Sequence, residues 1–181
     1  MPPRGLKLSS SVTVARYREL EQAGDRRALG EFFKERFAER FFDPLNNSAS
    51  KHGFTTLAVG CLVIETLESF HQGCADTHGK SKKMFSAFFE RETSLRVFGS
   101  PCNWFFHDIR CAILHQGEVR GGWRIWRKGQ LLDMSGKTIN ATKFLRELKK
   151  AVSDYGDQLT VNDECWLQFK KKMKAVCANC E

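Results

Sequence analysis

Arg110 and His115 stand five positions apart in this 181-residue chain. A histidine titrates near neutral pH, so its ring can accept or release a proton under ordinary conditions. An arginine stays charged, and its planar fork matches the oxygens of a phosphate group. Metal-free cleavage of RNA needs a group that takes the 2′-hydroxyl proton, a group that protonates the leaving oxygen, and positive charge beside the phosphorane. The pair therefore predicts this chemistry.

The spacing of the pair predicts that one copy of the chain does not complete the site. At roughly 100° per residue, positions 110 and 115 of one α-helix point about 140° apart. They do not share a face as residues four positions apart do. Two such helices that meet about a two-fold axis could bring an arginine and a histidine from each copy into one cleft. We therefore expect a homodimer.

His115 is placed in the last turn of its predicted helix, where the helix dipole favours a protonated ring and hence a general acid. Asp108 or Gln116 could orient the imidazole. Arginine and histidine at this spacing are weak evidence alone, since about 0.4 such pairs are expected by chance from the 14 arginines and 5 histidines. The alternative is that His115 caps a helix end and that Arg110 pairs with a carboxylate.

A second group of candidate residues follows His115. Residues 119–140 carry five basic groups and one acidic group, which is half of the net charge of +8. Cations that alternate with indoles are suited to RNA, because cations follow phosphates while indoles stack on bases. The predicted RNA-binding residues are Arg120, Trp123, Arg124, Trp126, Arg127 and Lys128. The alternative is that Trp123 and Ile125 pack on the helices, and we expect at least one tryptophan in the core.

Apolar periodicity predicts an all-α fold that positions these residues. Helices are expected over 12–23, 25–41, 53–71, 84–92, 100–116 (the motif helix), 141–155 and 163–176. The second of them should end at Asp43-Pro44. A small β-hairpin is expected over about 119–140, with strands near Trp123 and Leu131, a turn at Lys128-Gly129 and a further turn at Ser135-Gly136. We expect one domain with three parts, which are core helices at about 12–118, a basic hairpin at about 119–140 and C-terminal helices at about 141–181.

The helix over 53–71 carries a narrow polar strip of Glu65, Glu68 and Gln72. The strip is either a solvated face or a surface that faces a second subunit or a ligand. We include Glu65 among the supporting residues of the site for the second reason.

Composition excludes several other classes of protein. The N-terminus lacks the apolar segment of a signal peptide, and the longest apolar run, 57–64, is short for a membrane span. Seven cysteines without a signal peptide favour free thiols and a cytoplasmic location. Cys177 and Cys180 form a lone CxxC pair, whereas structural zinc needs four ligands, so we expect neither a metal nor a cofactor.

Residues 105–117, Phe105-Phe106-His107-Asp108-Ile109-Arg110-Cys111-Ala112-Ile113-Leu114-His115-Gln116-Gly117, resemble the signature helix of the HEPN superfamily. The apolar helix over 57–70 is also similar to bacterial proteins of this kind. The resemblance covers about residues 50–125. It implies a dimerising helical bundle with a metal-independent endoribonuclease site, in which the family's arginine and histidine correspond to Arg110 and His115.

Members of this superfamily act in toxin–antitoxin, abortive-infection and CRISPR-linked defence, so the resemblance implies RNA as substrate and an antitoxin or a defence-complex protein as partner. The chain has Cys111 where the family often has a polar residue, and Gly117 where one toxin subgroup has a tyrosine. Superfamily members that only bind nucleic acid also exist. The alternatives are therefore a non-catalytic module that binds RNA or a partner protein, and a helical subunit of a larger defence complex.

Overall fold

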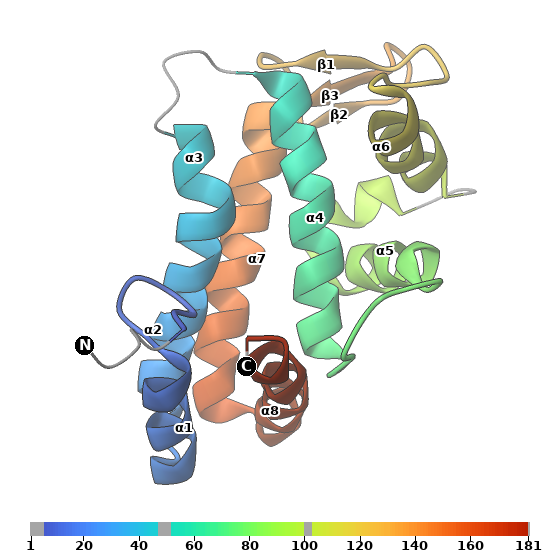
Figure 1. Ribbon diagram of the computed structural model, residues 1–181. Coiled ribbons are helices and arrows are strands. Elements are labelled where there is room, and N and C mark those ends of the chain that lie inside the picture. Colours follow the sequence, from blue (N-terminus) through green and yellow to red (C-terminus); the bar gives the residue numbers. More distant parts are fainter. Residues whose placement is uncertain (1–5, 47–51, 100–102, 181) are drawn as a thin grey trace. The chain divides into compact units, whose positions relative to one another are not determined.

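The computed structural model describes residues 6–46, 52–99 and 103–180. The described residues form a mainly helical fold with a small three-stranded sheet (Figure 1). The described helices are α1 (Val14–Ala23), α2 (Arg26–Phe37), η1 (Ala38–Phe42), α3 (Asp43–Asn46), α4 (Gly53–His71), α5 (Ser81–Arg91), η2 (Thr93–Phe98), η3 (Phe105–Cys111), α6 (Ala112–Gln116), α7 (Ala141–Val161) and α8 (Asp163–Ala178).

Contacts between residues divide the chain into two compact units. Of the described residues, the first unit contains 6–46, 69–76 and 152–180, and the second contains 52–68, 77–99 and 103–151. Helices α4 and α7 each contribute residues to both units. Arg110, His115 and the basic segment after them all belong to the second unit.

The core of the first unit is built from aromatic rings. Phe33 lies at its centre, with ring centroids 4.5 Å from Phe37 and 4.6 Å from Tyr155. Asp25 caps α2 as predicted, because its carboxylate accepts the Ala28 N–H at 3.0 Å. Gly30 of α2 faces Gly156 of α7 so closely that a Cβ on Gly30 would lie 2.5 Å from the Gly156 carbonyl oxygen.

The predicted helix end at Asp43-Pro44 is wrong, because the chain stays helical to Asn46. Residues 38–42 form a π-helical turn, in which the Asp43 N–H donates to the carbonyl of Ala38. Pro44 consequently stands in the first turn of α3. Proline has no N–H to donate, and the wider π-helical turn directly before it is where the regular helical hydrogen-bond pattern is interrupted.

The second unit surrounds another aromatic core. Helix α4 has the predicted bounds, and its Gly60 lets Phe144 and Leu148 of α7 approach, since a Cβ there would lie 2.9 Å from the Phe144 ring. Phe85 of α5 stacks on Phe105 of the motif helix at 6.2 Å between ring centroids. The predicted start of the motif helix at Ser100-Pro101 lies outside the described residues; the described part runs from Trp104 to Gln116 and ends at Gly117, with φ 68°.

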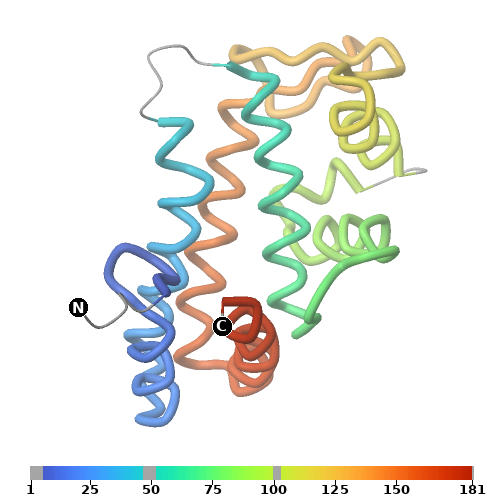
Figure 2. Tube along the Cα trace, viewed as in Figure 1, coloured from blue at the N-terminus to red at the C-terminus, as the bar shows by residue number. Residues whose placement is uncertain are grey.

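The strands after the motif helix pair differently from the predicted hairpin. They are β1 (Arg124–Trp126), β2 (Leu132–Asp133) and β3 (Thr138–Asn140), in the order β1-β3-β2. β1 runs parallel to β3, and only β2 and β3 form a hairpin, through the predicted turn at Ser135-Gly136. The fully buried Ile139 takes the central strand, with Ile125 and Leu132 as its neighbours on either side. Figure 2 shows the chain passing from the motif helix to these strands.

The sheet lies beside the N-terminal end of α4, where a Cβ on Gly53 would lie 2.9 Å from the Ile125 side chain (Figure 1). Asn140 caps α7 as predicted and accepts the Lys143 N–H at 3.0 Å. Helix α4 is the one described helix that is long and apolar enough to cross a membrane, and half of its most apolar window is buried inside the protein. The core helix of a globular protein passes the same test.

Candidate active site

The motif helix is wider than an ordinary α-helix at Arg110. Residues 105–111 form the π-helix η3, and the chain returns to α-helical geometry at Ala112. Such turns are rare and occur frequently at functional positions. Because the widened turn ends at Cys111, the step from Arg110 to His115 is mostly α-helical, and the two side chains stay on different sides of the helix.

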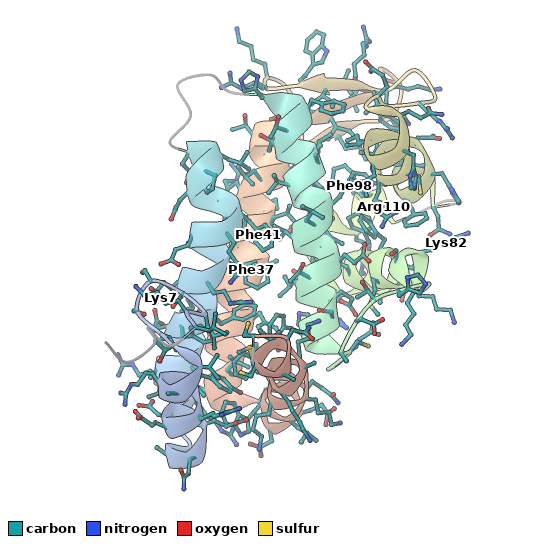
Figure 3. All side chains as sticks on the ribbon, in the orientation of Figure 1. Lys7, Phe37, Phe41, Lys82, Phe98 and Arg110 are labelled. Carbon is teal, nitrogen blue, oxygen red and sulfur yellow. The ribbon has the colours of Figure 1, made fainter. Side chains whose placement is uncertain are left out.

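Arg110 points inward and is held by side chains from two other helices. Its Nη2 donates to Glu65 Oε2 of α4 and to Ser81 Oγ of α5, both at 3.3 Å. Its guanidinium carbon lies 5.4 Å from the ring centre of Phe106. The side chain is 17% exposed, and its buried Nε has no hydrogen-bond partner in the described part of the chain. Figure 3 shows Arg110 among these helices.

Glu65 collects hydrogen bonds on both carboxylate oxygens. Oε1 accepts the hydroxyls of Thr77 at 2.6 Å and Ser81 at 2.7 Å, and Oε2 accepts from Arg110. Burial by itself raises the pKa of Glu65, but the hydroxyls of Ser81 and Thr77 together with Arg110 outweigh burial and hold the pKa below its ordinary value. Glu65 is therefore ionised at neutral pH and fixes the orientation of the guanidinium.

The polar strip on α4 is consequently not a solvated face in the second unit. Glu65 is 18% exposed, and Glu68 is fully buried and pairs with Arg91 of α5 at 3.1 Å. The sequence could not reveal these partners, because they lie more than ten positions away along the chain.

His115 lies in the last turn of α6, as predicted, and is exposed. Its imidazole forms no hydrogen bond or ion pair with Arg110 or with any other described residue. The structure of a single chain thus places the two motif residues on one helix without bringing their functional groups together.

Asp108 and Gln116 have partners other than His115. The Asp108 carbonyl accepts the Arg120 N–H at 2.8 Å, and a Cβ on Gly121 would lie 2.9 Å from the Asp108 carboxylate. Gln116 Oε1 accepts from Arg120 Nε at 2.8 Å. Both side chains therefore face the turn that follows the helix, and the expectation that one of them orients the imidazole is not met in a single chain.

The two tryptophans of the basic segment have different environments. Trp123 is 7% exposed and stacks on Trp104 at 3.9 Å between ring centroids, with 16° between the ring planes. It is a core residue, so its predicted role in binding RNA bases is wrong for this conformation. Trp126 is 51% exposed, with the Arg124 guanidinium carbon 5.8 Å from its ring centre.

The remaining cations of this segment lie at the surface. Arg120, Arg124, Arg127 and Lys128 are all exposed. Arg124 also donates to the Gly136 carbonyl at 2.9 Å, which anchors its guanidinium at the turn between β2 and β3. An exposed indole flanked by exposed cations is the arrangement that stacking on single-stranded nucleic acid requires.

The other features of the described residues add no residue to the predicted site. Among the described residues, no group of three or more histidine, cysteine, aspartate or glutamate side chains could hold a metal ion. The described cysteines are free, and burial raises the pKa of the Cys61 thiol to about 12. A cavity of about 500 Å³ lies in the first unit between α1 and α8 and contains none of the predicted site residues.

Comparisons with protein-family models, with curated proteins and with solved structures give no match to this chain.

Proposed function

We propose that this protein is a metal-independent endoribonuclease of HEPN type that uses Arg110 and His115. One observation carries the proposal: an inward-pointing arginine, fixed by Glu65 and Ser81 in a π-helical turn, stands five residues before an exposed histidine with no described partner. Arginine supplies charge to a phosphate and histidine supplies proton transfer, so together they cover the needs of RNA cleavage.

The reaction needs no external reagent. The 2′-hydroxyl loses its proton to a base, and its oxygen attacks the adjacent phosphorus. The bond from phosphorus to the 5′-oxygen of the next nucleotide breaks, and an acid protonates that oxygen. The products are a 2′,3′-cyclic phosphate and a 5′-hydroxyl. His115 acts as the acid or the base, while Arg110 stabilises the negative charge that develops on the phosphorane.

A second copy of the chain completes the site in this proposal. Arg110 and His115 lie on different sides of one helix, so a two-fold pairing of motif helices is the simplest way to build a cleft with both groups. Leu114, next to His115, is 46% exposed and offers an apolar contact for such a pairing. The RNA strand then extends to Trp126 and the cations around it. We place the activity in the cytoplasm, in a toxin or antiviral defence role with an antitoxin or defence-complex partner.

The decisive experiment incubates the purified protein with end-labelled single-stranded and structured RNA in EDTA. The parent is expected to cut and to leave cyclic-phosphate ends, and His115→Ala is expected to lose the activity. His107→Ala is the matched control, because it removes another exposed histidine from the same helix. If His115→Ala cuts as fast as the parent, or if His107→Ala alone is inactive, His115 is not the catalytic group.

The second candidate is a non-catalytic module that binds RNA or a partner protein. The partly buried ion pair of Arg110 with Glu65 favours it, because such a pair also serves to hold α4, α5 and the motif helix together. This candidate predicts that no RNA is cut, that Arg110→Ala lowers the melting temperature, and that RNA binding survives His115→Ala.

A further inference from the structure

A group of exposed lysines lies at the start of α5, beside the contact made by Arg110. Lys80, Lys82 and Lys83, called the lysine segment here, are all exposed, and none of them forms an ion pair with a described residue. Their ammonium groups are therefore available to an anion from outside the chain.

Ser81, between Lys80 and Lys82, connects the lysine segment to the candidate active site. Its hydroxyl donates to Glu65 and accepts from Arg110 Nη2 at 3.3 Å. Each of these two lysines is thus one residue from a side chain that touches Arg110. Figure 3 labels Lys82 at the outer edge of this region and Arg110 further in.

The net charge of this part of the sequence does not indicate a positive surface. Residues 51–118 have seven basic and seven acidic groups and no net charge. In the folded unit, however, Glu65 is occupied by Arg110 and two hydroxyls, and Glu68 is buried against Arg91. Each of these two carboxylates is paired with an arginine, so neither neutralises the lysine segment. Residues 77–89 contain these three lysines and no aspartate or glutamate, so the positive charge is local to the start of α5.

We infer that the lysine segment binds phosphates of the RNA strand that flank the phosphate held at Arg110. The inference rests on the proposed function and adds a path for the substrate, across the start of α5 to Arg110. Successive helical residues point roughly 100° apart, so Lys82 and Lys83 reach different phosphates. Lysine contacts of this kind release counterions, are independent of base sequence and weaken as salt rises.

The test measures binding of a fluorescein-labelled single-stranded RNA by anisotropy, in a His115→Ala background so that no RNA is cut. The variant K80Q/K82Q/K83Q is compared with K7Q/K171Q/K174Q, which removes three exposed lysines of the first unit and gives the same net charge. We expect the first variant to bind about 10- to 100-fold more weakly at 0.1 M salt and the slope of log K against log salt to fall by up to about 2. The control should stay within about threefold of the parent.

Equal losses in both variants, or none in either, would overturn the inference, because binding would then follow net charge or another surface. Melting curves check that both variants are folded. The outcome is separate from that of the proposed function. If the parent cuts RNA but K80Q/K82Q/K83Q binds RNA normally, only the role of the lysine segment is contradicted. If the parent never cuts RNA but K80Q/K82Q/K83Q binds RNA more weakly than the parent does, only the nuclease activity is contradicted.

Discussion

Glu65 controls the position of Arg110 most directly, since its carboxylate accepts from the guanidinium while two hydroxyls hold it in place. We predict that Glu65→Gln lowers the free energy of unfolding by about 1–3 kcal/mol at pH 7, because the buried guanidinium loses its charged partner. Cleavage should fall with it, since a displaced Arg110 no longer stabilises the phosphorane. Urea denaturation and the RNA assay in EDTA measure the two effects.

The effect of Glu65→Gln on the free energy of unfolding should depend on pH. The pKa of Glu65 is lower in the folded protein than its ordinary value of 4.5. The ionised carboxylate therefore stabilises the fold fully above pH 4.5, and this contribution is lost as pH falls through the folded-state pKa. The difference in the free energy of unfolding between the parent and Glu65→Gln should therefore narrow as pH falls from 4.5 to the folded-state pKa. Glu118→Gln, which removes an exposed carboxylate, should change stability by less than about 0.5 kcal/mol throughout. A Glu65→Gln effect that is independent of pH contradicts the assignment.

At the scale of elements, the two tryptophans of the segment after the motif helix are expected to have different roles. Trp123 should stabilise the fold, and Trp126 should bind RNA. Trp123→Ala should lower the free energy of unfolding by about 3–5 kcal/mol, because it removes a buried ring that stacks on Trp104. Trp126→Ala should change stability by less than about 0.5 kcal/mol, since that ring is half exposed. It should weaken single-stranded RNA binding roughly 5- to 150-fold, the range expected for the loss of one stacked base.

Urea denaturation and anisotropy on the two tryptophan variants decide between these roles. Normal RNA binding by Trp126→Ala would exclude the indole from the RNA path. A stable, binding-deficient Trp123→Ala would show that the buried ring leaves the core to meet the RNA.

The elements that the sequence predicted well are those set by local chemistry. The bounds of α4, the caps at Asp25 and Asn140 and the helix end at Gly117 depend on residues within four positions of one another. The mistake in the strand pairing came from a distant contact. The pairing of β1 with β3 depends on Ile139, 14 positions after Ile125.

In the candidate site, too, local features could be predicted from the sequence and distant contacts could not. Its motif helix was predicted, but the partner of Arg110 lies 45 positions away on α4, and the hydroxyls that orient that partner come from the loop and first turn before Met84. Neither Thr77 nor Ser81 carries a sequence signal beyond being polar. The spacing of apolar residues could not predict the π-helical turn at η3 either, because the same residues also fit an ordinary α-helix.

At the scale of the whole molecule, the proposed nuclease requires two chains, and Leu114 offers the sharpest test. Leu114→Glu puts a charge on an exposed apolar residue next to His115. If motif helices pair about a two-fold axis, two such carboxylates are brought together in an apolar contact, which opposes association. We predict a monomer in sedimentation equilibrium and loss of RNA cleavage, with a circular dichroism spectrum like that of the parent, because the exposed side chain does not support the fold of the single chain.

Leu167→Glu is the matched control, because Leu167 of α8 is 43% exposed and belongs to the first unit, outside the proposed site. It should leave association and cleavage as in the parent. A Leu114→Glu variant that cuts as a monomer, or a parent that is monomeric at concentrations where it cuts, would mean that one chain suffices. Arg110 would then have to leave Glu65 to meet His115 within that chain, and Glu65→Gln would accelerate cleavage instead of slowing it.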